Sequence, residues 1–125
     1  MAAGILAAKA LLLLGLVAGA QSQQCSSITI LNESGGSYRA RFSATASTSF
    51  TGLNLELRFD NAVNRLEFDS GASEKMDDHR FRLLSPGWVA QPGWKVEFTI
   101  TPHYSGGKST VVGAVMNGVD VCGNK

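Results

Sequence analysis

Apolar and polar residues alternate with a period of two along most of the chain after residue 28. The clearest runs cover residues 38–44, 53–59 and 94–100, where every second side chain is apolar. Side chains two apart point to the same face of a β-strand, so each run predicts a strand with one buried face. Shorter or less regular strands are expected at four further places: residues 28–30, 63–68, 81–83 and 109–122.

The segments between these runs favour turns and loops. Asp60-Asn61 predicts a turn, and Asn117-Gly118 predicts a hairpin within the last strand region. Residues 70–78 are polar and are expected to form a loop, and Ser85-Pro86-Gly87 is expected to end the strand that contains Phe81.

No segment after residue 20 shows a helical repeat of useful length, so the chain is predicted to be all-β. Strands that each carry one apolar face must bury those faces against one another. The predicted fold is therefore an immunoglobulin-like, antiparallel β-sandwich of seven to nine strands.

Residues 1–20 have the features of a secretory signal peptide. Lys9 is the only charge before a short apolar run, and Ala18-Gly19-Ala20 fits a small-residue cleavage site. The run is shorter than the roughly 20 apolar residues that a membrane span needs. An uncleaved signal anchor is the alternative, and the polar stretch after Ala20 favours cleavage. We expect a secreted, extracellular domain over residues 21–125, with no membrane attachment after cleavage.

Two cysteines, Cys25 and Cys122, lie near the two ends of the expected mature domain. In a secreted chain such a pair predicts a disulfide, whereas a metal site would need further ligands nearby. Asn32-Glu33-Ser34 fits the N-glycosylation sequon in what is expected to be a turn. Asn32 is therefore a predicted glycosylation site if the source is not bacterial.

The charge balance bears on the class of partner. Removal of residues 1–20 takes Lys+Arg from 11 to 10, against 10 Asp+Glu. A nearly neutral domain has no basic excess to neutralise a phosphate backbone or an anionic membrane surface. The sequence therefore argues against nucleic acid and membrane partners.

Catalytic chemistry has little support in the sequence. Asp77-Asp78-His79, with Glu74 close by, is the densest group of metal-ligating residues, but it is better interpreted as a solvated loop. His103 has no nucleophile paired with it, and no Gly-x-Ser-x-Gly elbow exists. Paired carboxylates at glycosidase spacing stay open, although so small a sandwich has little room for a deep cleft. We predict a protein that is not an enzyme and has no cofactor or metal.

The two tryptophans are predicted to differ. Trp94 has the same parity as Val96 and Phe98, which predicts a buried ring. Trp88 lies outside any alternation, between Pro86-Gly87 and Gln91-Pro92-Gly93, which predicts exposure. An exposed indole often marks a binding site and suits the apolar face of a sugar ring. The alternative is that Trp88 folds over the edge of the core as a lid.

Four features together resemble a known family: a cysteine near each end, the run at residues 50–59, Trp88 six residues before Trp94, and the ending at residues 119–123. Over residues 25–123 the chain is similar to family 2 carbohydrate-binding modules, which are cellulose- and chitin-binding β-sandwiches. The resemblance implies a non-catalytic module that binds a β-glucan such as cellulose, or chitin, by aromatic stacking. Such modules are often attached to glycoside hydrolases, so a separate hydrolase is an expected partner.

The chain departs from the family pattern at several positions. Trp88 matches one of the three usual aromatic positions, while those near Gly35-Gly36 and Leu66 lack an aromatic residue. Val89 follows Trp88 where the family often has Asn, and Leu53 replaces a core Trp.

The predicted ligand-binding residues are therefore Trp88, Tyr104 and Gln91, with Phe50 as a further loop aromatic. Tyr104 and Phe50 would complete a platform with Trp88 only if the loops converge. The missing aromatics support an alternative function, a secreted structural or protein-interaction β-sandwich that has lost the sugar site.

Overall fold

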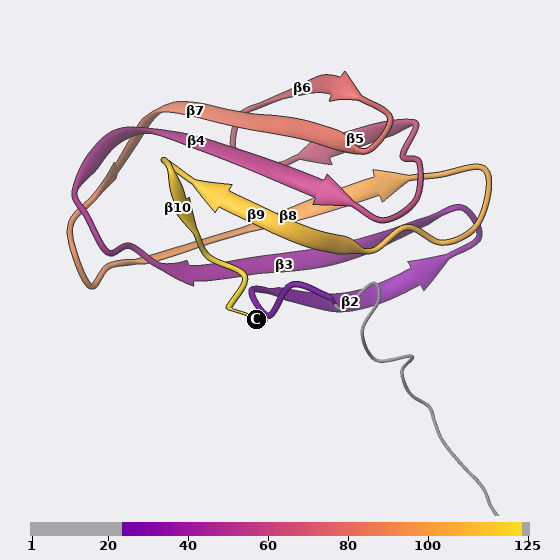
Figure 1. Ribbon diagram of the computed structural model, residues 1–125, viewed down its shortest axis with the longest axis horizontal. Helices are drawn as coiled ribbons and strands as arrows, with labels where there is room; N and C mark the ends of the chain where they lie inside the picture. The colour runs from indigo at the N-terminus through magenta and orange to yellow at the C-terminus, as the bar shows by residue number, and fades with distance from the viewer. Residues whose placement is uncertain (1–23, 124–125) are drawn as a thin grey trace, which may run out of the picture.

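The computed structural model describes residues 24–123, which form nine strands (Figure 1). The predicted signal peptide and its cleavage site lie outside the described residues. Within the described part, no helix is long and apolar enough to cross a membrane. The strands are, in chain order, β2 (Ile28–Ser34), β3 (Ser37–Thr45), β4 (Phe50–Phe59), β5 (Arg65–Phe68), β6 (Ala72–Asp77), β7 (Arg80–Ala90), β8 (Lys95–His103), β9 (Val111–Met116) and β10 (Val119–Asp120).

The strands form two sheets that face each other (Figure 1). One sheet has the strand order β10-β9-β4-β7-β6, and the other has the order β2-β3-β8-β5. All pairs within the sheets are antiparallel. The predicted all-β sandwich is thus confirmed.

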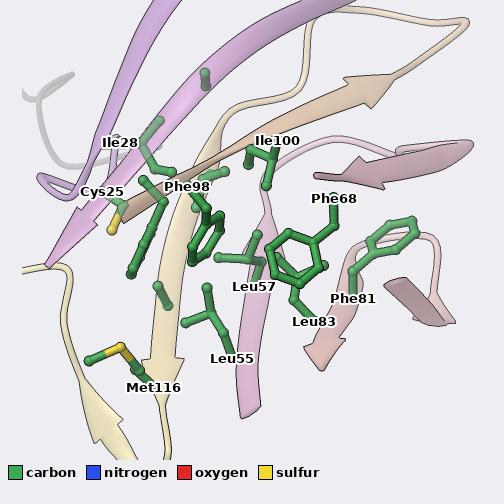
Figure 2. Packing of buried hydrophobic residues seen from close by; sticks show 14 of the residues in the cluster. Cys25, Ile28, Leu55, Leu57, Phe68, Phe81, Leu83, Phe98, Ile100 and Met116 are labelled. Atoms are coloured by element: carbon green, nitrogen blue, oxygen red, sulfur yellow. The ribbon is translucent and has the colours of Figure 1, made fainter. Parts of the chain in front are cut away.

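The core lies between the two sheets and follows the alternation in the sequence (Figure 2). Each alternating apolar residue of β4 from Leu53 to Phe59 is at most 2 % exposed. Phe98 of β8 stacks on Phe42 at a centroid distance of 4.8 Å and meets Phe68 edge-on, also at 4.8 Å. Such aromatic contacts stabilise a core beyond the area that they bury.

Strand β7 is longer than predicted, because it continues through Ser85-Pro86-Gly87 to Ala90. The register between β4 and β7 shifts between Thr51 and Leu53, which places a bulge opposite Gly52. A bulge leaves backbone groups out of the ladder, so a proline without an N–H is tolerated there. The expectation that the strand stops at residue 85 was wrong for this reason.

Strand β6 was predicted as a loop and instead forms the edge of the five-stranded sheet. Its burial pattern shows exposed residues at every position except Met76, which is partly buried. A strand that buries almost nothing on either face has no apolar alternation, so the sequence carried no periodic signal for it.

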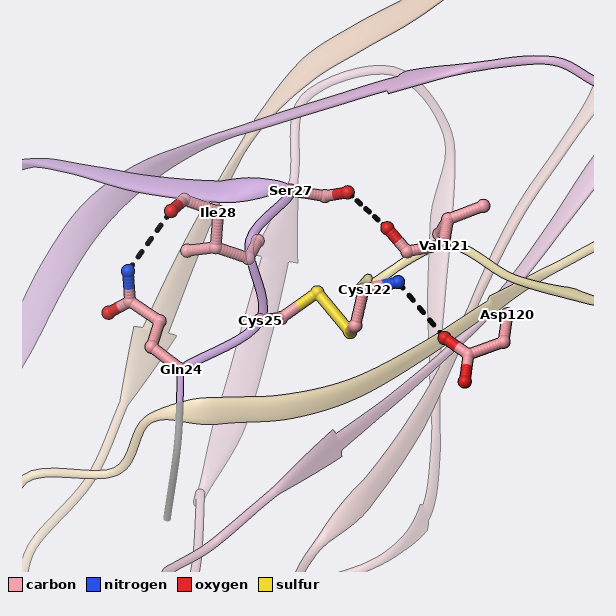
Figure 3. The surroundings of a disulfide bond; sticks show 7 residues. All are labelled: Gln24, Cys25, Ser27, Ile28, Asp120, Val121 and Cys122. Carbon is pink, nitrogen blue, oxygen red and sulfur yellow. Dashed lines mark hydrogen bonds between the residues drawn. A yellow bond between two sulfur atoms is a disulfide. The ribbon is translucent and has the colours of Figure 1, made fainter. Parts of the chain in front are cut away.

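A disulfide between Cys25 and Cys122 is confirmed, with the two Cα atoms 4.6 Å apart (Figure 3). Cys25 precedes β2 and Cys122 follows β10, so the bond joins edge strands of different sheets. Hydrogen bonds accompany it: the Ser27 hydroxyl donates to the carbonyl of Val121, and the Cys122 N–H donates to Asp120 at 3.0 Å.

The hairpin between β9 and β10 is confirmed as well. Asn117 and Gly118 have φ angles of 46° and 87°, the left-handed values that a two-residue type I′ turn requires. The side chain of Asn117 also accepts from the N–H of Asn54 at 3.0 Å and donates to the carbonyl of Gly52 at 2.9 Å. The turn is thereby fastened to β4.

Candidate functional site

The connections that contain or adjoin the candidate site residues lie at two ends of the sandwich (Figure 1). We call one the tryptophan end: it comprises residues 46–49, between β3 and β4, and residues 91–94, between β7 and β8. The other is the tyrosine end, which comprises residues 35–36 and 104–110. Strand β8 runs from one end to the other.

Trp94 is the exposed tryptophan, with 53 % of its surface accessible. The prediction that it belongs to the core was wrong. Trp94 has the parity of Val96 but precedes the first residue of β8, and its carbonyl accepts from the N–H of Ala46 at 2.8 Å. Alternation predicts which face of the sheet the Trp94 side chain lies on, but it does not predict its exposure. The ring is exposed because Trp94 lies just before the start of β8.

Trp88 is partly buried and packs against the core, so the predicted exposed indole is not this one. Its ring meets Phe98 edge-on, with centroids 5.9 Å apart and an interplanar angle of 75°. This is the arrangement of a lid over the core edge. A role of Trp88 in ligand binding stays a prediction.

The other predicted site residues are divided between the two ends. Gln91 is exposed and begins the turn that leads to Trp94, whose N–H donates to the Gln91 carbonyl at 3.0 Å. Phe50 pairs with Ala90 at this same end and is partly buried. Tyr104 lies at the tyrosine end, because it directly follows the last residue of β8. The structure therefore does not bring Tyr104 to Trp88.

The tryptophan end combines apolar rings with uncharged polar side chains. Beside Trp94, Val89 is 49 % exposed, while Phe50 and Trp88 pack against the core. Residues 46–49 are Ala-Ser-Thr-Ser and residues 91–94 are Gln-Pro-Gly-Trp, so neither connection has an ionisable side chain. Such a surface offers an indole, an amide and hydroxyls, which suit an uncharged ligand with both apolar and hydroxyl-bearing parts.

The tyrosine end is closed by its own side chains. Tyr38 is 1 % exposed, and its hydroxyl is the one buried side-chain polar atom without a hydrogen-bond partner in the described residues. Burial raises the pKa of Tyr38, and the neighbouring Tyr104 raises that pKa further. Lys108 lies 5.6 Å from the centre of the Tyr38 ring and pairs with Glu33 at 2.8 Å. These contacts cover the Tyr38 ring.

The acidic group near residue 77 is engaged in ion pairs. Asp77 accepts from Arg80 at 2.9 Å, and this bond, with the N–H of His79, lowers the pKa of Asp77. Asp78 pairs with Lys75 at 3.2 Å. Over the described residues, no set of three or more His, Cys, Asp or Glu side chains is placed to hold a metal ion.

Asn32, the predicted glycosylation site, is exposed. It lies in β2 next to a register shift, and the predicted turn comes later, after Ser34. The turn was misplaced because β2 is an edge strand whose second half has no buried residue. Its modification stays a prediction.

No protein-family model matches this chain, and no curated protein matches it. Among solved structures, the chitin-binding domain of Chi18aC from Streptomyces coelicolor is similar, with a TM-score of 0.53 and 15 % sequence identity. The match covers 78 % of this chain and 93 % of that domain. At this identity the similarity shows a shared fold.

Proposed function

We propose that this protein is a secreted, non-catalytic module that binds a neutral β-linked polysaccharide, with chitin as the first candidate and cellulose as the second. The observation that carries the proposal is the half-exposed indole of Trp94 at an end with no ionisable side chain in its connections. Trp94 takes the stacking role that the sequence suggested for Trp88.

The physical basis is stacking between a flat aromatic ring and a sugar ring. The C–H groups of a pyranose form an apolar face that fits an indole, and contact releases water from both surfaces. Gln91 lies in the same turn as Trp94 and is exposed, so its amide can hydrogen-bond hydroxyl groups of the sugar. Trp88 would support this surface from the core side, through its contact with Phe98.

Chitin comes first because a chitin-binding domain shares the fold. A common fold does not transfer a ligand, so this ranking sets only the order of testing. Cellulose follows because of the resemblance to family 2 modules. A separate glycoside hydrolase stays the expected partner in the same secreted fluid.

Secretion is part of the proposal. The Cys25–Cys122 disulfide is typical of oxidising compartments, in agreement with the signal peptide expected over residues 1–20. Glycosylation of the exposed Asn32 would be compatible with the same route in a eukaryotic source.

The test is retention on insoluble chitin and cellulose, compared for the wild type and Trp94→Ala. Leu31→Ala is a matched control, because Leu31 is an apolar residue of β2, 38 % exposed, that lies on another strand. We expect retention of the wild type and the control, and a loss of about tenfold or more for Trp94→Ala, since aromatic anchors dominate such contacts.

Retention of Trp94→Ala at the wild-type level would remove Trp94 from the role. If no polysaccharide retains the wild type, the alternative of a structural or protein-interaction domain takes its place. Hydrolysis of a soluble polysaccharide by the pure protein would overturn the non-catalytic assignment.

A further inference from the structure

The turn between β9 and β10 carries a chemical reactivity of its own. Asn117 is the only asparagine of the chain that is followed by glycine. Asparagine is a thermolabile residue, because the backbone nitrogen of the next residue can attack its side-chain amide carbon. Glycine has no side chain to hinder that attack. The sequence at this turn is therefore suited to spontaneous deamidation.

The reaction needs no reagent other than water. The nitrogen of Gly118 forms a bond to Cγ of Asn117, and the bond from Cγ to Nδ2 breaks. Nδ2 leaves as ammonia and takes up the proton that the Gly118 nitrogen loses, so that a five-membered succinimide ring remains. Water then opens the ring at one of its two carbonyl carbons. The product is aspartate, or isoaspartate with the main chain running through the former side chain.

The nucleophile of this reaction is accessible in the folded protein. Gly118 is exposed, with a φ angle of 87°, and apart from its chain neighbours no atom lies within 4 Å of the position that a Cβ would take. Among the described residues, the Gly118 N–H donates no backbone hydrogen bond. Neither packing nor a backbone partner therefore blocks the Gly118 nitrogen.

The side chain of Asn117, in contrast, is held away from the reaction. Its Nδ2 donates to the carbonyl of Gly52 at 2.9 Å, and its Oδ1 accepts from the N–H of Asn54 at 3.0 Å. The N–H of Asn117 also donates to the carbonyl of Asn54 at 2.8 Å. Both atoms of the side-chain amide are thus bound to β4. Rotation of this amide toward Gly118 breaks both side-chain bonds.

The hairpin is attached to the sheet mainly through this residue. Strand β10 has only two residues, lies at the edge of the five-stranded sheet and pairs with β9 alone. Short edge elements open locally at a lower free energy than the core does. Opening of the β9–β10 turn frees the Asn117 side chain without unfolding of the central strands.

Either product is incompatible with the native turn. An aspartate at position 117 has no amide donor for the carbonyl of Gly52, so that two acceptors face each other. Isoaspartate adds a methylene group to the main chain of a turn that requires two residues with positive φ. The modified hairpin therefore cannot recover its contacts with β4.

We propose that Asn117-Gly118 is a deamidation site that the fold controls: the bonds from Asn117 to β4 suppress the reaction, and detachment of the β9–β10 hairpin starts it. The modification is irreversible, so it marks molecules that have lost this hairpin. The proposal does not depend on the polysaccharide-binding function.

The test compares the native protein with the same protein unfolded in guanidinium chloride, at one mildly alkaline pH and one temperature. Peptide mapping by mass spectrometry follows the conversion of Asn117 to aspartate and isoaspartate. We expect the reaction to be about tenfold or more faster in the unfolded protein, because two side-chain hydrogen bonds no longer oppose it. After the denaturant is removed, the modified chains should show faster hydrogen exchange at the Asn54 N–H than unmodified chains.

Asn54, Asn61 and Asn64 are internal controls, since each is followed by a residue with a side chain and should stay unmodified in both samples. Asn117→Gly is the control variant: glycine accepts the positive φ of the turn but has no side-chain amide, so no conversion should occur. Equal rates in the native and unfolded protein would refute control by the fold. Absence of conversion in the unfolded protein would refute the site, and native exchange at Asn54 in modified chains would refute the loss of the hairpin contacts.

Discussion

The two ends of the sandwich use their aromatic residues in opposite ways. At the tryptophan end, Trp88 packs on Phe98 and Trp94 is 53 % exposed, in connections without ionisable side chains. At the tyrosine end, Tyr38 is 1 % exposed and is covered by its neighbours. The Trp94 ring is therefore accessible to a ligand, whereas Lys108 and Tyr104 lie against the Tyr38 ring.

The connections themselves explain this difference. Residues 91–94 form a tight turn, in which the N–H of Gly93 donates to the carbonyl of Ala46 at 2.8 Å. So short a connection leaves the Trp94 ring 53 % exposed. Residues 104–110 form a longer connection that folds back over Tyr38 and places Lys108 against its ring. The Tyr104 ring lies 6.2 Å from the Tyr38 ring and adds to this cover.

The largest expected effect comes from removing the disulfide, which joins the two sheets outside both ends. The double variant Cys25→Ala/Cys122→Ala should lower the free energy of unfolding by about 2–5 kcal/mol, because the disulfide closes a loop of 97 residues. Urea denaturation followed by tryptophan fluorescence measures this. The folded fraction should still bind polysaccharide, since neither end contains the bond. Loss of binding by protein that is still folded would show that the bond also positions the tryptophan end.

The second prediction separates the two tryptophans. Trp88→Ala should lower the free energy of unfolding by about 2–4 kcal/mol, because it removes a ring that packs on the core edge. Trp94→Ala should change stability by less than about 1 kcal/mol, because its ring is half exposed. Thermal and urea denaturation of both variants test this. Equal losses of stability would contradict the different roles assigned to the two rings.

Much of the fold could be predicted because burial and alternation coincide on the central strands. The alternating residues of β3, β4 and β8 face the core as expected, and Asn117-Gly118 makes the expected hairpin. Strand β6 was missed because it buries almost nothing, so it has no periodic pattern. The continuation of β7 past Pro86 depends on a bulge, which arises from pairing with β4 and not from local preference.

The candidate site could be predicted only in part. Gln91 and a tryptophan do occur together at one end, but the exposed ring belongs to Trp94, because exposure depends on where the sheet ends. A platform of Tyr104 with Trp88 required the loops to converge, and the direction of β8 instead puts Tyr104 at the opposite end.

The third prediction concerns the buried phenol of the tyrosine end. Tyr38→Phe should leave stability unchanged or raise it by about 1 kcal/mol, because the hydroxyl has no hydrogen-bond partner and burial without one is unfavourable. A loss of more than about 1 kcal/mol in urea denaturation would reveal a partner for this hydroxyl.

The same residue predicts the alkaline behaviour of the protein. Burial raises the pKa of Tyr38 in the folded state. The contribution of this pKa difference to the free energy of unfolding is therefore complete below the unfolded pKa of about 10, and it is lost as pH rises above that value. The wild type should therefore lose stability above about pH 10, and Tyr38→Phe should lose less. Parallel curves for the two proteins between pH 9 and 12 would contradict the raised pKa.

The smallest expected effect tests the charged cover of the tyrosine end. Lys108 pairs with Glu33 at 2.8 Å, but both side chains are about half exposed, so Glu33→Ala should lower stability by no more than about 0.5 kcal/mol. Lys108→Ala should lower it by about 0.5–1 kcal/mol, because it also removes a cation 5.6 Å from the Tyr38 ring centre and the apolar stem of the side chain. Lys108→Met keeps most of the stem and should fall between the two. Chemical denaturation at low salt resolves these differences, and polysaccharide retention should be the same for all three variants. If Glu33→Ala were as destabilising as Lys108→Ala, the ion pair and not the contact with Tyr38 would hold this end closed.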